Sequence, residues 1–207
     1  MQMEFIQKLL GVFLVGNLNS LLDKLNSFSR KGYTENDVGC SMGVREDEYE
    51  IALIDRGFAK KMPFVINSEI SSVVRDVCNP SFDRGMNARL LFEWVVNNVR
   101  YGTNKRKGGY RNSVEVFRDR EGVCGEMSML YTTMVRSIGM RASYVKVDRD
   151  ISDKEVSHAC AMLDLKGRNG GFTLVDPAYG NCDIQHRSFR PLTDFEIFCN
   201  LNGWNGL

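Results

Sequence analysis

The chain has 207 residues, a net charge of +1, 43% hydrophobic residues and 26% charged residues. This length is sufficient for one well-packed domain, with room for a second small lobe. The nearly balanced charge creates no overall field that would attract nucleic acid or an acidic membrane, so neither is expected as a partner.

Cysteine and histidine are too sparsely arranged for a structural metal site. The six cysteines include no Cys-x-x-Cys pair, and the two histidines are His158 and His186. We therefore predict neither a metal nor a cofactor, and we expect the thiols to be mostly reduced. The apolar run from Leu9 to Val15 is too short to span a bilayer and lacks a basic stretch before it, so a cytoplasmic protein without a membrane span is predicted.

The N-terminal part is predicted to be helical. Residues 3–28 place leucines on one helical face, residues 48–60 form a weaker helical pattern, and the glycine-rich residues 29–47 connect them. We expect the first helix to pack on a core. A membrane helix is the weaker alternative, because its polar positions are rich in Asn rather than Lys. We predict that residues 1–80 form an accessory region, either a lid or a partner surface, and that residues 81–207 form a core of their own.

Two further helices are predicted before the middle of the chain. Asn67 or Ser68 caps the first, and an apolar face from Ala88 to Val99 marks the second. The basic run from Asn104 to Arg111 has two interpretations, a phosphate-binding patch or a solvated loop. The loop is favoured because no second basic cluster accompanies the run. Ser113 to Arg118 is predicted to form a short helical turn.

Cys124 lies at the predicted start of a helix. After it, apolar residues recur at helical spacing up to Ile138, and Gly139 then provides the stop. The first N–H groups of a helix have no partner within the helix and carry partial positive charge. A thiolate at this position is stabilised relative to the thiol, so more nucleophile is present near neutral pH. A buried structural cysteine at a helix start is the alternative.

Beyond Gly139 the pattern changes to strands. Ala142 to Val147, Val156 to Leu165 and Phe172 to Asp176 are predicted strands, and residues 166–171 form a hairpin-like turn between the last two. A capping-box pattern at Thr193 and Glu196 predicts a short final helix. The order of helices followed by an antiparallel sheet packed on the Cys124 helix indicates an α+β domain.

Three residues in this arrangement have the chemistry of a cysteine enzyme. A cysteine nucleophile needs a base, and the base needs a third group that fixes its orientation. His158 follows Cys124 on a strand, and Asp176 ends the neighbouring strand, so both can lie on one face of the sheet. Because the sheet must pack on the helix, that face can also meet the helix N-terminus where Cys124 lies. The alternative for each residue is structural, with His158 in a core and Asp176 ending a strand.

Several motifs between residues 85 and 182 also match a known family. They are Val99-Arg100-Tyr101, Arg120-Glu-Gly-Val-Cys-Gly-Glu126, Arg136-Ser-Ile-Gly-Met-Arg141, Ser157-His158-Ala159 and Leu174-Val-Asp-Pro-Ala-Tyr-Gly180. On these motifs the chain resembles the transglutaminase-like superfamily. The resemblance implies a papain-related α+β fold with N-terminal helices, a nucleophile-bearing helix packed on an antiparallel sheet, and a catalytic triad of Cys124, His158 and Asp176.

Two positions depart from the family pattern. Cys160 and Phe172 stand where the family often has tryptophans that shape the acyl and acceptor channels. The chain also has no room for the extra β-domains of the large calcium-dependent enzymes and no evident calcium loop. These departures bear on the substrate preference and not on the triad.

The predicted activity is attack of Cys124 on an amide or peptide carbonyl, through a thioester that passes to water or to an amine. Hydrolysis of a protein or peptide substrate is slightly favoured over acyl transfer. The backbone N–H of Cys124 is the expected oxyanion donor, with Asn112 as a guess for the second. The alternatives are a small-molecule N-acyltransferase, similar to arylamine acetyltransferases, and a non-catalytic interaction module that retains the fold. His186, expected to be exposed, is the rival base.

Overall fold

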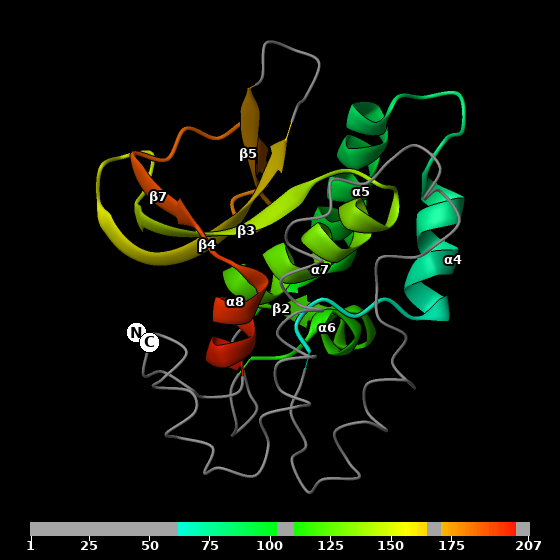
Figure 1. Cartoon of the computed structure of the whole chain (residues 1–207), viewed down its shortest axis with the longest axis horizontal. Coiled ribbons are helices and arrows are strands. Elements are labelled where there is room, and N and C mark those ends of the chain that lie inside the picture. Colours follow the sequence, from blue (N-terminus) through cyan, green and yellow to red (C-terminus); the bar gives the residue numbers. More distant parts are fainter. Residues whose placement is uncertain (1–61, 103–109, 165–170, 202–207) are drawn as a thin grey trace, which may run out of the picture. The chain divides into compact units, whose positions relative to one another are not determined.

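A computed structural model describes residues 62–102, 110–164 and 171–201 of the chain (Figure 1). The described helices are α4 (Ser68–Val77), α5 (Arg84–Asn98), α6 (Ser113–Asp119), α7 (Cys124–Ser137) and α8 (Asp194–Leu201). The described strands are β1 (Arg100–Tyr101), β2 (Glu121–Gly122), β3 (Ala142–Arg149), β4 (Glu155–Asp164), β5 (Phe172–Asp176), β6 (Asn181–Cys182) and β7 (Ser188–Pro191).

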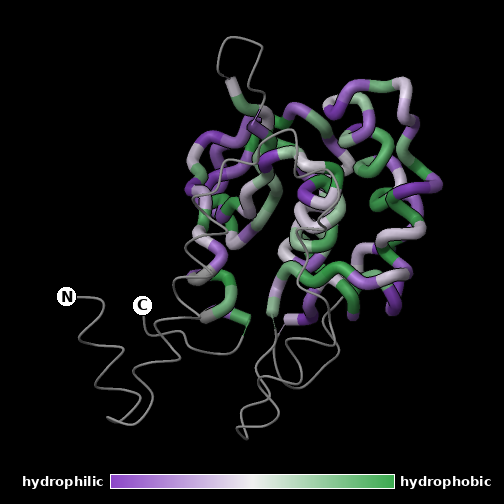
Figure 2. The backbone as a smooth tube through the Cα atoms, turned by 45° about the vertical axis from the view of Figure 1, so that its right-hand side comes forward, coloured by the Kyte–Doolittle hydropathy of each residue, from purple (hydrophilic) through white to green (hydrophobic). Residues whose placement is uncertain are grey.

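Helix α7 is the centre of the described part. It lies between the sheet and the helices α4, α5 and α6 (Figure 1), and every residue from Gly125 to Val135 is buried. Because the helix meets neighbours on all sides, small and hydroxyl side chains such as Ser128 and Thr132 are buried with the apolar ones. Figure 2 shows that hydrophilic segments are frequent at the periphery of the described part. The nucleophile candidate Cys124 is therefore held at the end of the most firmly packed helix.

Polar side chains fix the starts of the other helices. The side chains of Asn67, Asp83 and Asn112 accept hydrogen bonds from the first turns of α4, α5 and α6. The predicted cap at Asn67 is thus confirmed, and the short helix predicted from Ser113 is confirmed as α6. These caps satisfy N–H groups that have no partner within the helix.

The sheet has five antiparallel strands in the order β6-β5-β4-β3-β7. The three strands predicted from the sequence are confirmed as β3, β4 and β5. One face of this sheet, with Ala161 and Val175, packs into the main core against α7. The other face, with Val145, Cys160 and Leu174, forms a second, smaller apolar cluster.

A chain segment crosses the second face of the sheet. Strands β6 and β7 lie at opposite edges, so residues 183–187 between them must pass over the sheet. Ile184 in this segment is buried in the same cluster as Leu174, and its backbone N–H donates to the carbonyl of Leu174. The segment therefore lies on the face away from α7.

The N-terminal predictions lie largely outside the described residues. The predicted helices at 3–28 and 48–60 cannot be compared with the structure, nor can most of the basic run from residue 104. Where the chain is described, Val65, Ile66 and α4 pack in the same core as α5 and α7. Within the described ranges, no helix is long and apolar enough to cross a bilayer.

Candidate active site

Cys124 is the first residue of α7, as the helical spacing predicted. Its side chain is half-buried, and the backbone N–H groups of Gly125 and Ala159 donate hydrogen bonds to its sulfur. The parallel pairing of β1 with β2 sets Tyr101 opposite Gly122, close to the nucleophile candidate. The phenol of Tyr101 contacts both the backbone N–H and the sulfur of Cys124. The thiol thus lies among donors at a helix N-terminus, where a thiolate is favoured.

A buried ion pair holds the segment that leads into α7. The Glu126 carboxylate is inaccessible to solvent and accepts hydrogen bonds from the backbone N–H of Val123 at 3.0 Å and of Arg111 at 2.8 Å. It also accepts from Nε and Nη2 of Arg111, at 3.1 and 2.8 Å. Arg111 in turn donates to Asp119 at 2.8 Å. Glu126 therefore connects the residue before Cys124 to the loop before α6.

His158 and Asp176 form the second half of the site. Nε2 of His158 lies 2.6 Å from Oδ2 of Asp176, across the neighbouring strands β4 and β5. The carboxylate is fully buried, and its Oδ1 accepts the backbone N–H groups of Ala178 and Tyr179, each at 3.0 Å. With Nε2 committed to Asp176, Nδ1 is the nitrogen that remains for the hydrogen bond between His158 and Cys124.

The face of the sheet that carries His158 and Asp176 reaches Cys124 at the N-terminus of α7, but it is not the face that packs along the helix. Ala159 and Ala161, on the opposite face, pack on α7. The two halves still meet because the pairing of β5 with β4 stops at Ala161 and Val175, so the backbone N–H of Ala159 is free to donate to Cys124. The site therefore lies at the end of β5, where groups from both faces can meet.

The contacts shift both pKa values in the direction of an ion pair. Burial alone would raise the pKa of the Cys124 thiol, but hydrogen bonding and attraction to His158, with the two backbone N–H groups, lower it below its ordinary value. Burial alone would lower the pKa of His158, but its hydrogen bonds to Asp176 and Cys124 raise the pKa to about 9. A thiolate beside an imidazolium is the combination that nucleophilic attack on an amide requires.

His186 lies in this site as well, contrary to the expectation that it would be exposed. It is 5% exposed, and its Nε2 lies 3.1 Å from Oδ2 of Asp176, the same oxygen that His158 approaches. The crossing segment of residues 183–187 brings it there. A signal for this position was absent from the sequence, because a polar stretch without periodicity does not reveal that it crosses a sheet.

The three residues around this oxygen were also considered as a metal site. His158, Asp176 and His186 offer ligand atoms that all lie within 4.8 Å of one another. However, both Nε2 atoms approach Oδ2 at hydrogen-bond distances of 2.6 and 3.1 Å. These distances are those of two hydrogen bonds to one carboxylate oxygen.

Aromatic side chains flank the two halves of the site. The ring of Tyr179 stacks on His158, with centroids 4.6 Å apart and an interplanar angle of 27°, and 47% of Tyr179 is exposed. Tyr101 is 58% exposed on the side of Cys124. Tyr144 reaches the helix start from β3, since a Cβ on Gly125 would lie 2.5 Å from its hydroxyl oxygen. Tyr101 and Tyr179 belong to the family motifs, but the sequence assigned no role to them, and Tyr144 was not named.

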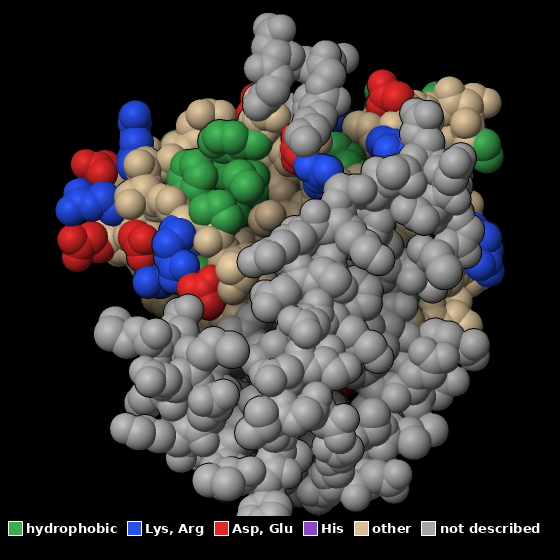
Figure 3. Space-filling model, viewed as in Figure 1, with side chains coloured by type: hydrophobic (Ala, Val, Ile, Leu, Met, Phe, Trp, Pro, Cys, Tyr) green, Lys and Arg blue, Asp and Glu red, His purple; other side chains and the backbone are tan. Residues whose placement is uncertain are grey.

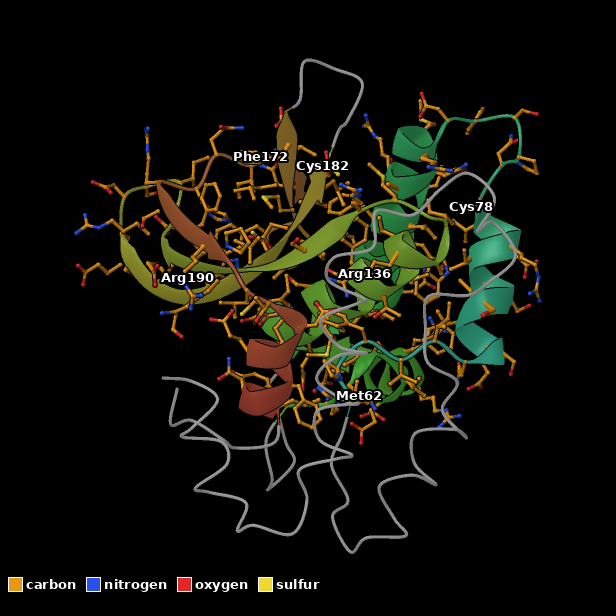
Figure 4. The ribbon with its side chains drawn as sticks, in the orientation of Figure 1. Met62, Cys78, Arg136, Phe172, Cys182 and Arg190 are labelled. Atoms are coloured by element: carbon orange, nitrogen blue, oxygen red, sulfur yellow. The ribbon has the colours of Figure 1, made fainter. Side chains whose placement is uncertain are left out.

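Three other residues named from the sequence have positions that differ from the roles considered for them. Asn112, the guess for a second oxyanion donor, is occupied in the capping box of α6. Phe172 begins β5 at the end opposite Asp176 and packs edge-on against Phe189, with ring centroids 5.9 Å apart. Phe172 is labelled in Figure 4. Figure 3 shows a hydrophobic patch exposed on the part of the sheet near this residue. Cys160 is buried in the second apolar cluster.

Comparison with solved structures finds relatives of the fold at low identity. A putative cysteine protease from Cytophaga hutchinsonii is 13% identical with a TM-score of 0.50, and the match covers 74% of this chain and 52% of that one. Legionella pneumophila LapG is 9% identical with a TM-score of 0.47, and the match covers 60% of this chain and 70% of LapG. This chain thus spans about half the length of the Cytophaga protein. Comparison with curated proteins found no significant match.

Comparison with family models gives the assignment. The model described as the transglutaminase-like superfamily matches residues 72–177, which is just over half of the chain and includes Cys124, His158 and Asp176. The helices and the antiparallel sheet have the α+β architecture of the structural relatives. The chain belongs to the transglutaminase-like superfamily.

Proposed function

We propose that the chain is a cysteine enzyme that acts on amide or peptide bonds through a thioester, with Cys124, His158 and Asp176 as its catalytic triad. The observation that carries the proposal is the continuous set of hydrogen bonds from Cys124 through His158 to Asp176. Membership of the transglutaminase-like superfamily and the similarity in fold to a putative cysteine protease support it. The pKa shifts of Cys124 and His158 in opposite directions supply the thiolate and the proton that the reaction needs.

The reaction begins when the Cys124 thiolate adds to the carbonyl carbon of the amide. The carbonyl π bond breaks, and its oxygen takes the negative charge. The backbone N–H of Cys124 is in place to hold that oxygen, because it already meets the phenol oxygen of Tyr101. Tyr101 is largely exposed, so its side chain has room to withdraw when a substrate enters.

His158 then gives its proton to the leaving nitrogen. The C–N bond breaks, the amine departs, and the acyl group remains on the Cys124 sulfur as a thioester. In the second step, His158 accepts a proton from the incoming water or amine, which attacks the thioester carbon and releases the thiolate. Asp176 holds Nε2 of His158 throughout, so that Nδ1 stays directed at the sulfur and the reacting nitrogen.

The surroundings favour a polypeptide substrate. The phenols of Tyr101 and Tyr179 flank Cys124 and His158 and are about half exposed, so each offers an aromatic face for a peptide chain. We propose hydrolysis as the main outcome. Transfer to an amine competes with it, because water and the amine would attack the same thioester.

A single assay separates these outcomes. Dimethylated casein, whose lysines are blocked, is incubated with the protein and dansylcadaverine, and the products are read by mass spectrometry and fluorescence. Peptide cleavage or loss of ammonia indicates transfer to water, and fluorescent casein indicates transfer to the amine. We expect products from the wild type and none from Cys124→Ala or His158→Ala. Equal product from the wild type and Cys124→Ala would refute thioester chemistry.

A further inference from the structure

The carboxylate of Asp176 is shared by both histidines of the chain. Oδ2 receives Nε2 of His158 at 2.6 Å and Nε2 of His186 at 3.1 Å, while Oδ1 receives two backbone N–H groups. Four donors thus surround one buried carboxylate. A triad requires only the hydrogen bond to His158, so the second imidazole calls for a separate explanation.

We propose that His186 is a positioning residue, which directs Oδ2 of Asp176 at His158 and limits how strongly Asp176 attracts the His158 proton. The inference rests on the proposed function, because it assigns His186 a part in the same reaction. The hydrogen bond of His186 goes to Asp176, and through that carboxylate it acts on the proton of His158.

The first argument is geometric. The segment of residues 183–187 crosses the sheet and is fixed by backbone hydrogen bonds at both ends, from Asp183 to Leu174 and from Arg187 to Arg149. His186 therefore approaches Asp176 from a direction that is independent of β4 and β5. Its ring also meets His158 edge-on, with centroids 5.6 Å apart, and Tyr179 at 5.8 Å. A carboxylate held from a second direction has fewer alternative rotamers.

The second argument concerns the cost of a buried imidazole. Nδ1 of His186 has no hydrogen-bond partner among the described residues. A buried nitrogen without a partner is unfavourable, and a phenylalanine would fill the same space without that cost. The contact that a histidine provides here and a phenylalanine cannot is the hydrogen bond from Nε2 to Asp176.

The third argument concerns the proton of His158. Each donor to a carboxylate stabilises its negative charge and reduces its affinity for a further proton. With His186 bound to the same oxygen, Asp176 attracts the Nε2 proton of His158 less strongly. His158 then gives its Nδ1 proton to a leaving amine more readily than it would if Asp176 had no hydrogen bond from His186. General acids act best when their pKa lies near the working pH.

The experiment uses the fact that the chain has two histidines in total. In protein labelled with ¹⁵N-histidine, the imidazole nitrogens of both residues can be followed against pH by NMR, and assigned with His158→Ala and His186→Gln. The other titratable groups around the two rings must be considered in fitting the curves; they are Cys124 on α7, Cys160 on β4, Asp176 on β5, Tyr179 after β5, Asp150 after β3 and Tyr101 on β1.

Two variants separate the hydrogen bond from packing. His186→Phe keeps the ring and removes the donor, whereas His186→Gln keeps a donor near the position of Nε2. The exposed neighbour Gln185→Ala is the control. We expect the titration midpoint of His158 to rise by at least ~0.5 unit in His186→Phe, because Asp176 is then unshared, and to return towards the wild-type value in His186→Gln.

An unchanged midpoint and tautomer of His158 in His186→Phe would overturn the proposal and leave His186 a packing residue. If His186→Phe does not fold, His186→Leu replaces it as the variant without a donor. A His158 midpoint that is raised in His186→Leu and close to the wild-type value in His186→Gln supports the proposal. Equal His158 midpoints in His186→Leu and His186→Gln overturn it. Failure of the proposed function would look different. In that case, Cys124 would react with iodoacetamide equally fast in the wild type and in His158→Ala, whatever the His186 variants do.

Discussion

Among single residues, Asp176 determines which nitrogen of His158 faces Cys124. An ionised carboxylate only accepts hydrogen bonds, so the short contact at 2.6 Å places the proton on Nε2 of His158. Nδ1 then faces the thiol. It carries a lone pair when His158 is neutral and a proton when His158 is an imidazolium. Asp176 can do this because its other oxygen is fixed by two backbone N–H groups at the turn after β5.

The ring of Tyr179 stacks on His158, and the effect of removing it should be measurable. A stacked aromatic pair contributes about 0.5–1.5 kcal/mol, so we expect Tyr179→Ala to slow the alkylation of Cys124 at neutral pH by about two- to tenfold. The ring is responsible, so Tyr179→Phe should react at nearly the wild-type rate. A wild-type rate in Tyr179→Ala would show that the stacked ring does not support the His158–Asp176 pair.

Among the elements, the start of α7 is held by packing on one side and by an ion pair on the other. Gly125 faces Ala159 and the hydroxyl of Tyr144, at a place where no Cβ fits without movement. Glu126, one residue further, receives Arg111 and the backbone of Val123. These contacts fix the position of Cys124 without touching the substrate.

The first prediction at this scale concerns Gly125. In Gly125→Ala, the new Cβ would lie 2.5 Å from the hydroxyl oxygen of Tyr144, so either the helix or the tyrosine must shift. Overpacking of this kind costs about 1–3 kcal/mol, which urea unfolding would measure. Adding Tyr144→Phe removes the clashing oxygen and should recover part of the loss. Independent, additive effects of the two substitutions would contradict the contact.

The second prediction concerns the buried pair of Glu126 and Arg111. Removal of one partner leaves the other charge buried, which costs about 3–5 kcal/mol, so Glu126→Ala should lower the free energy of unfolding by that amount. The exposed pair of Arg89 and Glu93 is the matched control, and Arg89→Ala should cost at most about 0.5 kcal/mol. Similar losses of unfolding free energy in the two variants would mean that the buried pair contributes no more to stability than the exposed pair.

The elements around Cys124 were predictable from the sequence, but their mode of packing was not. Helical spacing and Gly139 defined α7, and alternation defined β3 to β5. Strands β6 and β7 have two and four residues, too few for alternation to reveal them. Their positions at opposite edges depend on long-range pairing, and so does the burial of His186. The same reason explains why the sequence does not show which face of the sheet packs along α7.

For the whole molecule, the family assignment and the site agree on the same segment. The family match of residues 72–177 contains α7, β4 and β5, the three elements that supply Cys124, His158 and Asp176. Outside it, α8 is attached through Arg136 of α7, labelled in Figure 4, which donates to Asp194 at 2.8 Å.

The measurement that tests the account most directly is the alkylation rate of Cys124 by iodoacetamide as a function of pH. Peptide mass spectrometry resolves Cys124 from Cys78 and Cys182, which serve as internal references because burial raises the pKa of both thiols, that of Cys182 to about 11. The lowered pKa of Cys124 means that its thiolate should persist as the pH falls below ~8.5, the free-thiol value.

We predict that at pH 6 Cys124 reacts at least about tenfold faster than a free thiol, and that His158→Ala abolishes this advantage. In the wild type, the thiolate should be paired with a protonated His158 up to pH about 9, where the imidazolium loses its proton. If Cys124 instead titrates as an ordinary thiol, with the same curve in the wild type and in His158→Ala, then Cys124 and His158 do not form an activated pair and the proposed catalytic mechanism is wrong.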